Sequence, residues 1–430
     1  MLLKGALVAT LDPPEIARAD IRVEGDSVVA KGPGLKRLRG EPVEDCSGKL
    51  ILPGQVCSHT HSYSALSRGM PAPRRRPRTF PEILRNIWWK LDQGLDDESI
   101  HYSALVSAIE AVRCGTTTLV DHHASPNAIA GSLDIIRGAF SAVGIRSVLC
   151  YEVTDRGGRQ RRDAGLAEND RFLSATRDDP MARGLVGAHA SFTLSDRSLA
   201  ALGELVRFHQ SGIHIHAAEA TDDAVLTARR YGAGIVERLE RHGVLTESSV
   251  LAHGVHLTPR ELGRIAAAGS WLVHNPRSNM NNGVGHARVE GFGDRAALGT
   301  DGWRADMLEE ARAAHFGLRD RLGPAAPDLA SRLLSGSHRL ATALFGVPIG
   351  ALEPGAAADL VVHDYPSPTP MTSANLTWHA LTGLHAGTIR HVMIGGRWVC
   401  RDGAVTTVDT DHVYRGAKRA AAELWKRLVA

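Results

Sequence analysis

The sequence predicts an α/β protein: a (β/α)8 TIM-like barrel with a small β-sandwich domain built from both chain ends. Short apolar runs alternate with segments of helical spacing through the middle of the chain, and β-rich segments occupy both ends. Repeated β–α units form parallel sheets, and eight of them favour a closed barrel. We expect the barrel at 53–349 and the composite sandwich domain at 1–52 and 350–430.

The two ends of the chain are predicted to form strands rather than helices. Their short apolar runs, bounded by turns that contain glycine, lie at 6–11, 20–23, 27–30, 359–363 and 390–401. Such runs are typical of short strands. Since the two ends share this pattern, we expect them to assemble into one sheet domain.

The middle of the chain repeats a strand followed by a helix or a long loop. Eight apolar runs are candidate strands, at 51–57, 117–120, 147–150, 185–188, 213–217, 250–253, 271–273 and 296–298. Segments with helical spacing include 99–112, 132–143, 198–208, 223–241 and 259–268. A doubly wound open sheet is the structural alternative to a barrel. No glycine-rich phosphate motif opens any of these helices, which argues against a nucleotide phosphate site.

Residues 68–95 interrupt the repeat. The segment begins rich in proline and arginine and becomes amphipathic around Trp88 and Trp89. It follows the first strand directly, so in a barrel it lies at the mouth where the carboxyl ends of the strands meet. We predict a lid or a dimer contact, and the alternative is a solvated surface loop. Whether the arginines of 74–78 face an anionic group of a substrate is left open by the sequence.

Composition limits the class of protein. Hydrophobic residues make up 43% and charged residues 23% of the 430 residues, as in ordinary globular proteins. The net charge of +3 is too balanced to predict a nucleic acid or an anionic membrane as a partner. Five scattered cysteines without a Cys-x-x-Cys pair argue against a disulfide framework and a zinc ribbon. With no signal-peptide pattern and no run of about 18 apolar residues, we expect a cytoplasmic protein.

Two histidines follow the first predicted strand. His59 and His61 are separated by one residue, and residues two apart on a strand point to the same face. Two imidazoles held in this way form half of a site for zinc, iron, nickel or copper. Among 21 histidines such a pair is weak evidence by itself, so the other half must come from elsewhere in the chain.

Histidine or aspartate stands at the end of six of the eight predicted strands. These residues are His59 with His61, His189, His216, His253, His274 and Asp301. Barrel enzymes keep their active sites at this end of the strands. One structural histidine at a strand end is commonplace, but so many in register favour a shared site.

These stretches resemble the amidohydrolase superfamily, in the branch that holds guanine deaminase, the triazine hydrolases and related heterocycle deaminases. The similarity covers essentially the whole chain, including the stretch LEPGAAADL at 352–360. Three runs are closest to the SsnA-type aminohydrolases, namely VDHHASP at 120–126, YEVTDR at 151–156 and GTDG at 299–302. These motifs are specific as a set, but the substrate of that subgroup is poorly defined.

The resemblance implies a centre with one divalent metal ion. Its ligands would be His59, His61, His216 and Asp301. Three neutral imidazoles and one carboxylate suit zinc, with iron(II) as the alternative, and the metal would acidify a bound water to give a hydroxide nucleophile. Glu219 would shuttle protons, while His253 and Asp301 would orient the hydroxide.

Three further histidines are predicted to contact the substrate. The resemblance places His189 there, and His274 and His123 are added because they end strands near the expected site. A hydrogen-bonded structural pair is the alternative for 122–123. We expect His214 to be packed, because it points to the face opposite to His216.

The absence of a lysine on the fourth predicted strand distinguishes between the metal subtypes of this superfamily. Its two-metal members typically bridge the metals with a carboxylated lysine from the fourth strand. This chain has no lysine between 91 and 417, and its fourth strand carries His189 instead. We therefore expect a mononuclear site.

The ligand set and the resemblance together predict a metal-dependent aminohydrolase. It would use a metal-bound hydroxide to remove an exocyclic amine from a purine-, pterin- or pyrimidine-like heterocycle. A cyclic amide hydrolase or a hydrolytic dechlorinase using the same site is the alternative, and a non-enzymatic paralogue would be expected to have a broken ligand set. The partner would be a small heterocyclic substrate, with no nucleic acid and no membrane, and the resemblance implies a homodimer or higher homo-oligomer.

Overall fold

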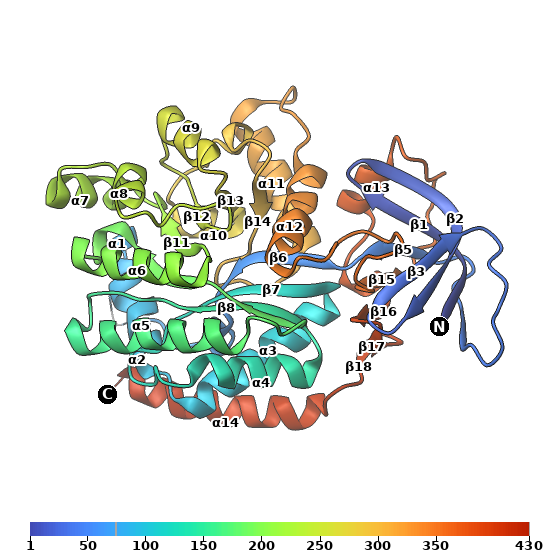
Figure 1. The fold of residues 1–430 in the computed structure, drawn as a ribbon, viewed down its shortest axis with the longest axis horizontal. Helices are drawn as coiled ribbons and strands as arrows, with labels where there is room; N and C mark the ends of the chain where they lie inside the picture. Colours follow the sequence, from blue (N-terminus) through green and yellow to red (C-terminus); the bar gives the residue numbers. More distant parts are fainter. Residues whose placement is uncertain (74, 430) are drawn as a thin grey trace.

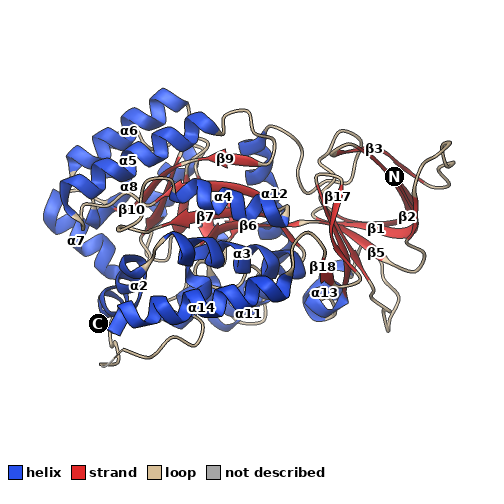
Figure 2. Ribbon diagram, turned by 90° about the horizontal axis from the view of Figure 1, so that it is seen from below, coloured by secondary structure: helices blue, strands red, loops and turns tan. Residues whose placement is uncertain are grey.

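Two parallel sheets surrounded by helices form the middle of the chain (Figures 1 and 2). The structure is a computed structural model that describes residues 1–73 and 75–429. The first sheet has the order β6-β7-β8-β9 and the second the order β10-β11-β12-β13-β14. Their strands are β6 Gln55–Thr60, β7 Thr116–His123, β8 Arg146–Tyr151, β9 Ala182–Gly184, β10 Val186–Ala190, β11 Ile213–Ala217, β12 Val250–His253, β13 Trp271–His274 and β14 Ala296–Leu298.

Isolated bridges connect the two parallel sheets at two places. A parallel bridge joins Thr60, at the end of β6, to Asp301 beyond β14, and another joins Val153 beyond β8 to Ala188 of β10. At the second of these places the backbone N–H of His189 also donates to the carbonyl oxygen of Val153, at 2.9 Å. The arrangement of parallel strands inside helices is of the TIM-barrel type.

Three strands lie where the sequence places them, at 213–217, 250–253 and 296–298. The predicted run at 51–57 is wrong as a single strand, because the chain leaves one sheet and enters another at Gly54. A Cβ atom at Gly54 would lie 2.3 Å from Thr117 Cγ2, so only glycine allows this close passage. The fourth strand divides at Leu185 into β9, which pairs with β8, and β10, which pairs with β11.

Helices alternate with these strands along the chain and surround the two sheets (Figure 2). They are α3 Asp97–Arg113, α4 Ser132–Val143, α5 Gly158–Ala175, α6 Asp196–His209, α7 Thr221–Tyr231, α8 Ile235–Arg241, α9 Pro259–Ala267, α10 Pro276–Asn282, α11 Met307–Leu322 and α12 Ala330–Phe345. The helix predicted at 223–241 is two helices, because Gly232 ends α7 in the left-handed conformation with φ of 63°.

A nine-stranded sheet unites the two ends of the chain, at the right of Figure 1. Its order is β18-β17-β16-β15-β5-β1-β2-β3, and β4 pairs with β1. The strands are β1 Leu2–Leu11, β2 Pro14–Glu24, β3 Ser27–Gly32, β4 Val43–Asp45, β5 Leu50–Pro53, β15 Leu360–His363, β16 Ile389–Ile394, β17 Arg397–Arg401 and β18 Ala404–Val405, with the helix α13 Leu376–Thr382 between β15 and β16. The join between the two chain ends is the antiparallel pair of β5 with β15. The two-layer sandwich stays a prediction.

The last helix, α14 Thr410–Val429, returns to the other end of the molecule and lies along α3 (Figure 1). The indole N–H of Trp425 donates to the carbonyl oxygen of Leu66 at 2.8 Å, and Arg427 Nε donates to that of Gly94 at 2.7 Å. The C-terminal helix therefore supports the segment that follows β6.

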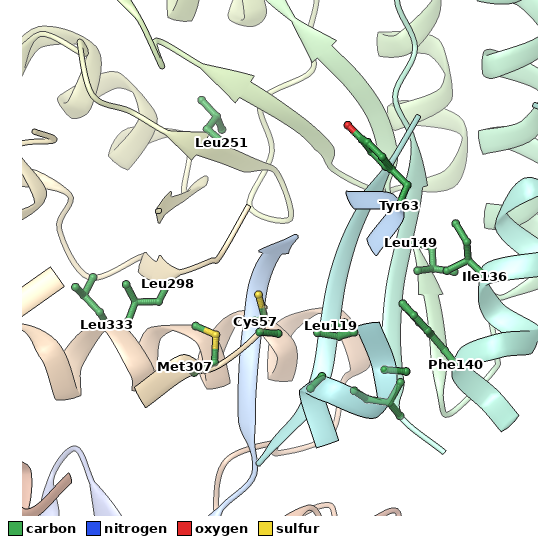
Figure 3. Packing of buried hydrophobic residues seen from close by; sticks show 14 of the residues in the cluster. Cys57, Tyr63, Leu119, Ile136, Phe140, Leu149, Leu251, Leu298, Met307 and Leu333 are labelled. Atoms are coloured by element: carbon green, nitrogen blue, oxygen red, sulfur yellow. The ribbon is translucent and has the colours of Figure 1, made fainter. Parts of the chain in front are cut away.

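Side chains on the outer face of the strands form a dry layer under the helices (Figure 3). Cys57, Leu119 and Leu149 come from the adjacent strands β6, β7 and β8, and Ile136 and Phe140 of α4 belong to the same cluster. All five are at most 1% exposed. Full burial of one such apolar side chain stabilises the folded protein by about 1.5–3 kcal/mol, so this layer holds the helices on the strands.

No helix in the described part of the chain is long and apolar enough to span a membrane.

Candidate active site

The four predicted ligands converge at the carboxyl ends of the strands. His59 belongs to β6 and His61 follows it, His216 belongs to β11, and Asp301 lies beyond β14. One ligand atom from each of the four lies within 4.8 Å of the other three. Asp301 Oδ1 is 3.0 Å from His61 Nε2 and 3.6 Å from His59 Nε2, and the Nε2 atoms of His61 and His216 are 3.1 Å apart. Ligands about 2.0–2.1 Å from a tetrahedral zinc ion are separated by roughly 3.3 Å, so these residues fit such an ion.

Backbone carbonyls fix the tautomers of two of these histidines. His61 Nδ1 donates to the carbonyl oxygen of His122 at 2.5 Å, and His216 Nδ1 donates to that of His189 at 2.9 Å. The proton on each ring is therefore on Nδ1, and the Nε2 lone pairs face the cluster. Metal-binding histidines usually have such a partner on the other ring nitrogen.

His59 is held by another histidine, His214, rather than by the backbone. Its Nδ1 lies 2.9 Å from Nε2 of His214, whose own Nδ1 is 3.6 Å from the Cys150 sulfur. His59 Nε2 is buried and has no hydrogen-bond partner among the described residues. Burial lowers the pKa of His59 well below its usual range, so its ring is neutral and its lone pair is available. An orphaned buried nitrogen that faces a carboxylate and two other imidazole nitrogens is the expected sign of a cation site.

Asp301 carries the negative charge of the cluster. Burial would raise its pKa, but the adjacent imidazoles of His59 and His61 outweigh burial and hold that pKa well below its usual range. For His61 burial opposes protonation, yet the Asp301 carboxylate raises its pKa to about 9, so a cation held by Nε2 would have to displace a proton from that nitrogen. Ser278 Oγ donates to Asp301 Oδ2, which leaves Oδ1 directed at the histidines.

Glu219 and His253 also lie beside Asp301. One ligand atom from each of these three residues lies within 4.8 Å of the other two. Glu219 Oε2 is 3.7 Å from His253 Nε2, and Oε1 accepts a hydrogen bond from Asn282 Nδ2 at 3.4 Å. Burial raises the pKa of Glu219 to about 7, close to the value that suits a group that both accepts and donates a proton. His253 Nδ1 bonds to Asn279 Oδ1 at 2.8 Å, and its buried Nε2 has no partner among the described residues.

The backbone at these strand ends is strained. Ala218, His253 and Asp301 have positive φ angles of 52°, 78° and 53°. Such angles are uncommon for residues other than glycine and tend to persist at functional sites, where the surrounding structure enforces them. Here they turn the chain sharply after β11, β12 and β14, at the place where the functional side chains are required.

A cavity opens beside the ligand cluster. His61, His216, Glu219 and Asp301 form part of its wall, and Tyr63, Phe80, Leu84, Trp88, Trp89 and Phe192 provide apolar and aromatic surface. The segment predicted to be a lid supplies four of these residues, through the short helices α1 Phe80–Ile83 and α2 Trp89–Gly94 and the π-helical turn Leu84–Trp88 between them. Aromatic side chains of this kind can stack against a flat ring. Arg74 lies outside the described residues.

The predicted substrate contacts lie in different places. His189 lines the cavity. His123 is fully buried, with Nε2 2.9 Å from Ser125 Oγ, and it is not among the lining residues described. His274 lies at a separate small cavity, with its ring 6.4 Å from that of Phe292. The roles of these three histidines stay predictions.

Sequence reasoning assigned no role to Glu152, although the run at 151–156 contains it. Glu152 lies one residue beyond β8, lines the cavity and is only 3% exposed. Arg156 Nη2 donates to its Oε1 at 3.0 Å, and the Arg156 guanidinium stacks 4.5 Å from the centre of the Trp89 ring. Asp92 also lines the cavity, 3.4 Å from Arg156. The signal that could have identified Glu152 in the sequence is its position directly after a strand of the barrel.

The sequence pattern of the Amidohydrolase family matches residues 50–399. The chain is 29% identical to a 5-methylthioadenosine/S-adenosylhomocysteine deaminase of Thermococcus sibiricus, over 93% of each chain. It is 30% identical to the protein of that name in Haloarcula marismortui, over 96% of this chain and 95% of the relative. It is also 29% identical to a 5'-deoxyadenosine deaminase of Methanopyrus kandleri, over 87% of this chain and 86% of the relative.

Solved structures share the fold. An adenosine deaminase from Xanthomonas campestris with bound zinc superposes with a TM-score of 0.85 at 21% identity, over 98% of each chain. A guanine deaminase from C. acetobutylicum with bound guanine gives a TM-score of 0.81 at 17% identity, over 92% of this chain and 99% of that one. Together with the family match over most of the chain, these findings show that the protein belongs to the amidohydrolase family and is a hydrolase that acts on C–N bonds.

Proposed function

We propose that this protein is a metal-dependent aminohydrolase that removes an exocyclic amine, as ammonia, from an amino-substituted heterocycle. The observation that carries the proposal is the convergence of His59, His61, His216 and Asp301, with Glu219 beside them at the cavity. The names of the relatives favour the adenine ring of a nucleoside as the first class to test, and pterins and pyrimidines follow.

We propose zinc as the ion, with iron(II) as the alternative, held by the three Nε2 atoms and by Asp301. A divalent ion bound there would act as a Lewis acid and make water a nucleophile near neutral pH. Glu219 would take a proton from the attacking water and deliver it to the departing amine, an acid/base contribution of roughly 10²–10⁴-fold. His253, with Nδ1 held by Asn279, would direct Nε2 at the attacking oxygen.

The decisive measurement is ammonia release from a panel of rings by the zinc-loaded protein. The panel should contain adenosine, 5'-deoxyadenosine, 5'-methylthioadenosine, adenine, guanine, pterin and cytosine. Ammonia from at least one of them is expected. A zinc-loaded sample that releases none, yet opens a cyclic amide or removes chloride from a chlorinated ring, would contradict the proposal and favour the alternative reaction.

The Glu219→Gln substitution tests the proton shuttle. Glutamine keeps the size of the side chain but cannot accept the proton, so kcat should fall by about 10²–10⁴-fold. Bound metal per chain should stay unchanged, because Glu219 is not among the four ligands. Loss of both metal and activity would instead place Glu219 in the metal site.

Three structural expectations complete the proposal. The bridges from β6 to β14 and from β8 to β10 support one closed barrel. The proposed division is a terminal domain at 1–52 and 350–430 and a barrel domain at 53–349. The packing of α14 on α3 supports assigning 410–429 to the barrel domain instead. The homodimer or higher oligomer stays a prediction, which light scattering would test.

A further inference from the structure

Glu152 is a buried carboxylate with one unused oxygen. The side chain is only 3% exposed and lines the cavity beside the ligand cluster. Oε1 accepts a hydrogen bond from Arg156, but no hydrogen bond from the described residues reaches Oε2. Oε2 is not one of the enclosed polar atoms that lack a partner, so it is accessible from the cavity, and a bound molecule that donates to it gains a hydrogen bond to a carboxylate.

The imidazole of His122 faces Oε2 but cannot supply that donor. His122 Nδ1 lies 3.5 Å from Glu152 Oε2. His122 Nε2, however, is 3.1 Å and 3.2 Å from the carbonyl oxygens of Ala188 and His214, which are acceptors only, so the ring proton is on Nε2. The Nδ1 atom of the neutral ring then presents a lone pair to the carboxylate, and Oε2 stays free to accept.

His189 adds a second acceptor beside Glu152. Its Nε2 lies 3.8 Å from Glu152 Oε1. Its Nδ1 is 2.8 Å from Thr193 Oγ1, and that hydroxyl donates its own hydrogen to the carbonyl oxygen of Ala190 at 3.0 Å. Because the hydroxyl must accept from His189, the ring proton is on Nδ1, and Nε2 faces Glu152 as a lone pair.

The rest of the cavity wall is also rich in acidic side chains. Its acidic lining residues are Asp92, Glu152, Glu219, Asp223 and Asp301. No lysine or arginine belongs to the described part of this lining. Glu152 also lies within 4.8 Å of ligand atoms of His189 and His216, so it is next to the place where the reacting carbon must come.

We propose that Glu152 and His189 form an acceptor pair that selects neutral or cationic rings with N–H donors next to the reacting carbon. The exocyclic NH2 group of an amino-substituted ring supplies such donors, and a ring nitrogen that carries a hydrogen adds another. A chloro or carbonyl substituent at the same carbon would set a lone pair against a carboxylate, and an anionic ring would meet the same repulsion. This selection rests on the proposed function, because it names the class of ring that the same site deaminates.

The test compares binding of matched amino and chloro rings, without turnover. Full-length zinc-loaded Glu219→Gln protein is titrated by calorimetry with adenine and 6-chloropurine, and with 2,4-diaminopyrimidine and 2,4-dichloropyrimidine. Glu152→Gln is then added to the same background. Glu168→Gln is the matched control, because Glu168 is also a buried glutamate paired with an arginine, Arg171, but lies outside the cavity lining described.

Loss of one hydrogen bond to a charged group should reduce the amino-over-chloro preference by about 10- to 100-fold in Glu152→Gln and leave it unchanged in Glu168→Gln. An unchanged preference in Glu152→Gln, a parent protein that prefers the chloro rings, or one that binds no amino ring would each overturn the acceptor pair. If Glu152→Gln does not fold, as judged by circular dichroism, Glu152→Asp replaces it, because the shorter carboxylate should lower the same preference. Failure of the deaminase itself is separate, since it would appear as absent ammonia release by the protein with Glu219 intact.

Discussion

The hydrogen bond between His214 and His59 predicts a specific loss of metal affinity. His59 Nδ1 must carry the ring proton if Nε2 is to bind a metal, and His214 Nε2, 2.9 Å away, is its acceptor. In His214→Phe a flat ring still fills the space, but the His59 N–H is left buried without a partner. Such a loss costs about 1–3 kcal/mol, and outer partners of metal-binding histidines contribute roughly 10- to 100-fold in metal affinity.

The assay is zinc affinity measured by competition with a chelator, with far-ultraviolet circular dichroism to confirm the fold. His363→Phe is a suitable control, because His363 is also buried and bonded through a single ring nitrogen, to Thr388, but lies in the terminal sheet. We expect a dissociation constant 10- to 100-fold higher in His214→Phe and unchanged in the control. A folded His214→Phe protein with zinc affinity within twofold of the parent would refute the reasoning.

Two further predictions concern stability. Burial raises the pKa of Asp92 from its ordinary 3.8 to about 7, so the unfolded chain has already released this proton at pH 5 while the folded protein releases it only near pH 7. The contribution of this group to the free energy of unfolding therefore falls by about 2–3 kcal/mol as pH rises from 5 to 7. Urea denaturation of Asp92→Asn should lack this decline, and a parallel decline in both proteins would contradict the prediction. Asp359→Asn breaks a buried two-bond ion pair with Arg146, at 3.0 and 3.2 Å, that joins the terminal sheet to β8. The free energy of unfolding should fall by about 3–5 kcal/mol, and a fall below about 1 kcal/mol would show that the pair contributes little.

Family and fold type follow from the sequence because their signals are local. An apolar run that ends in His, Glu or Asp is visible within ten residues, and the eight runs were found near their observed places. The errors fell where a glycine changes the path of the chain. Gly54 separates two strands of different sheets, and Gly232 ends α7. Glycine is a turn signal at both positions, but glycine also occurs inside regular elements, so the residue alone does not show where an element ends.

The sequence by itself determined which chemical groups this protein has and that they stand at the ends of strands. Only the tertiary structure decided which nitrogen of each imidazole is free and what each buried carboxylate faces. His214 and His59 are 155 positions apart, and their hydrogen bond depends on the angle at which two strands from different sheets meet. The role of Glu152 likewise depends on the tautomers of two histidines, which are set by carbonyl and hydroxyl groups from other strands and loops. Side-chain periodicity gives the face of one strand, whereas hydrogen bonding across the site is a property of the packed whole.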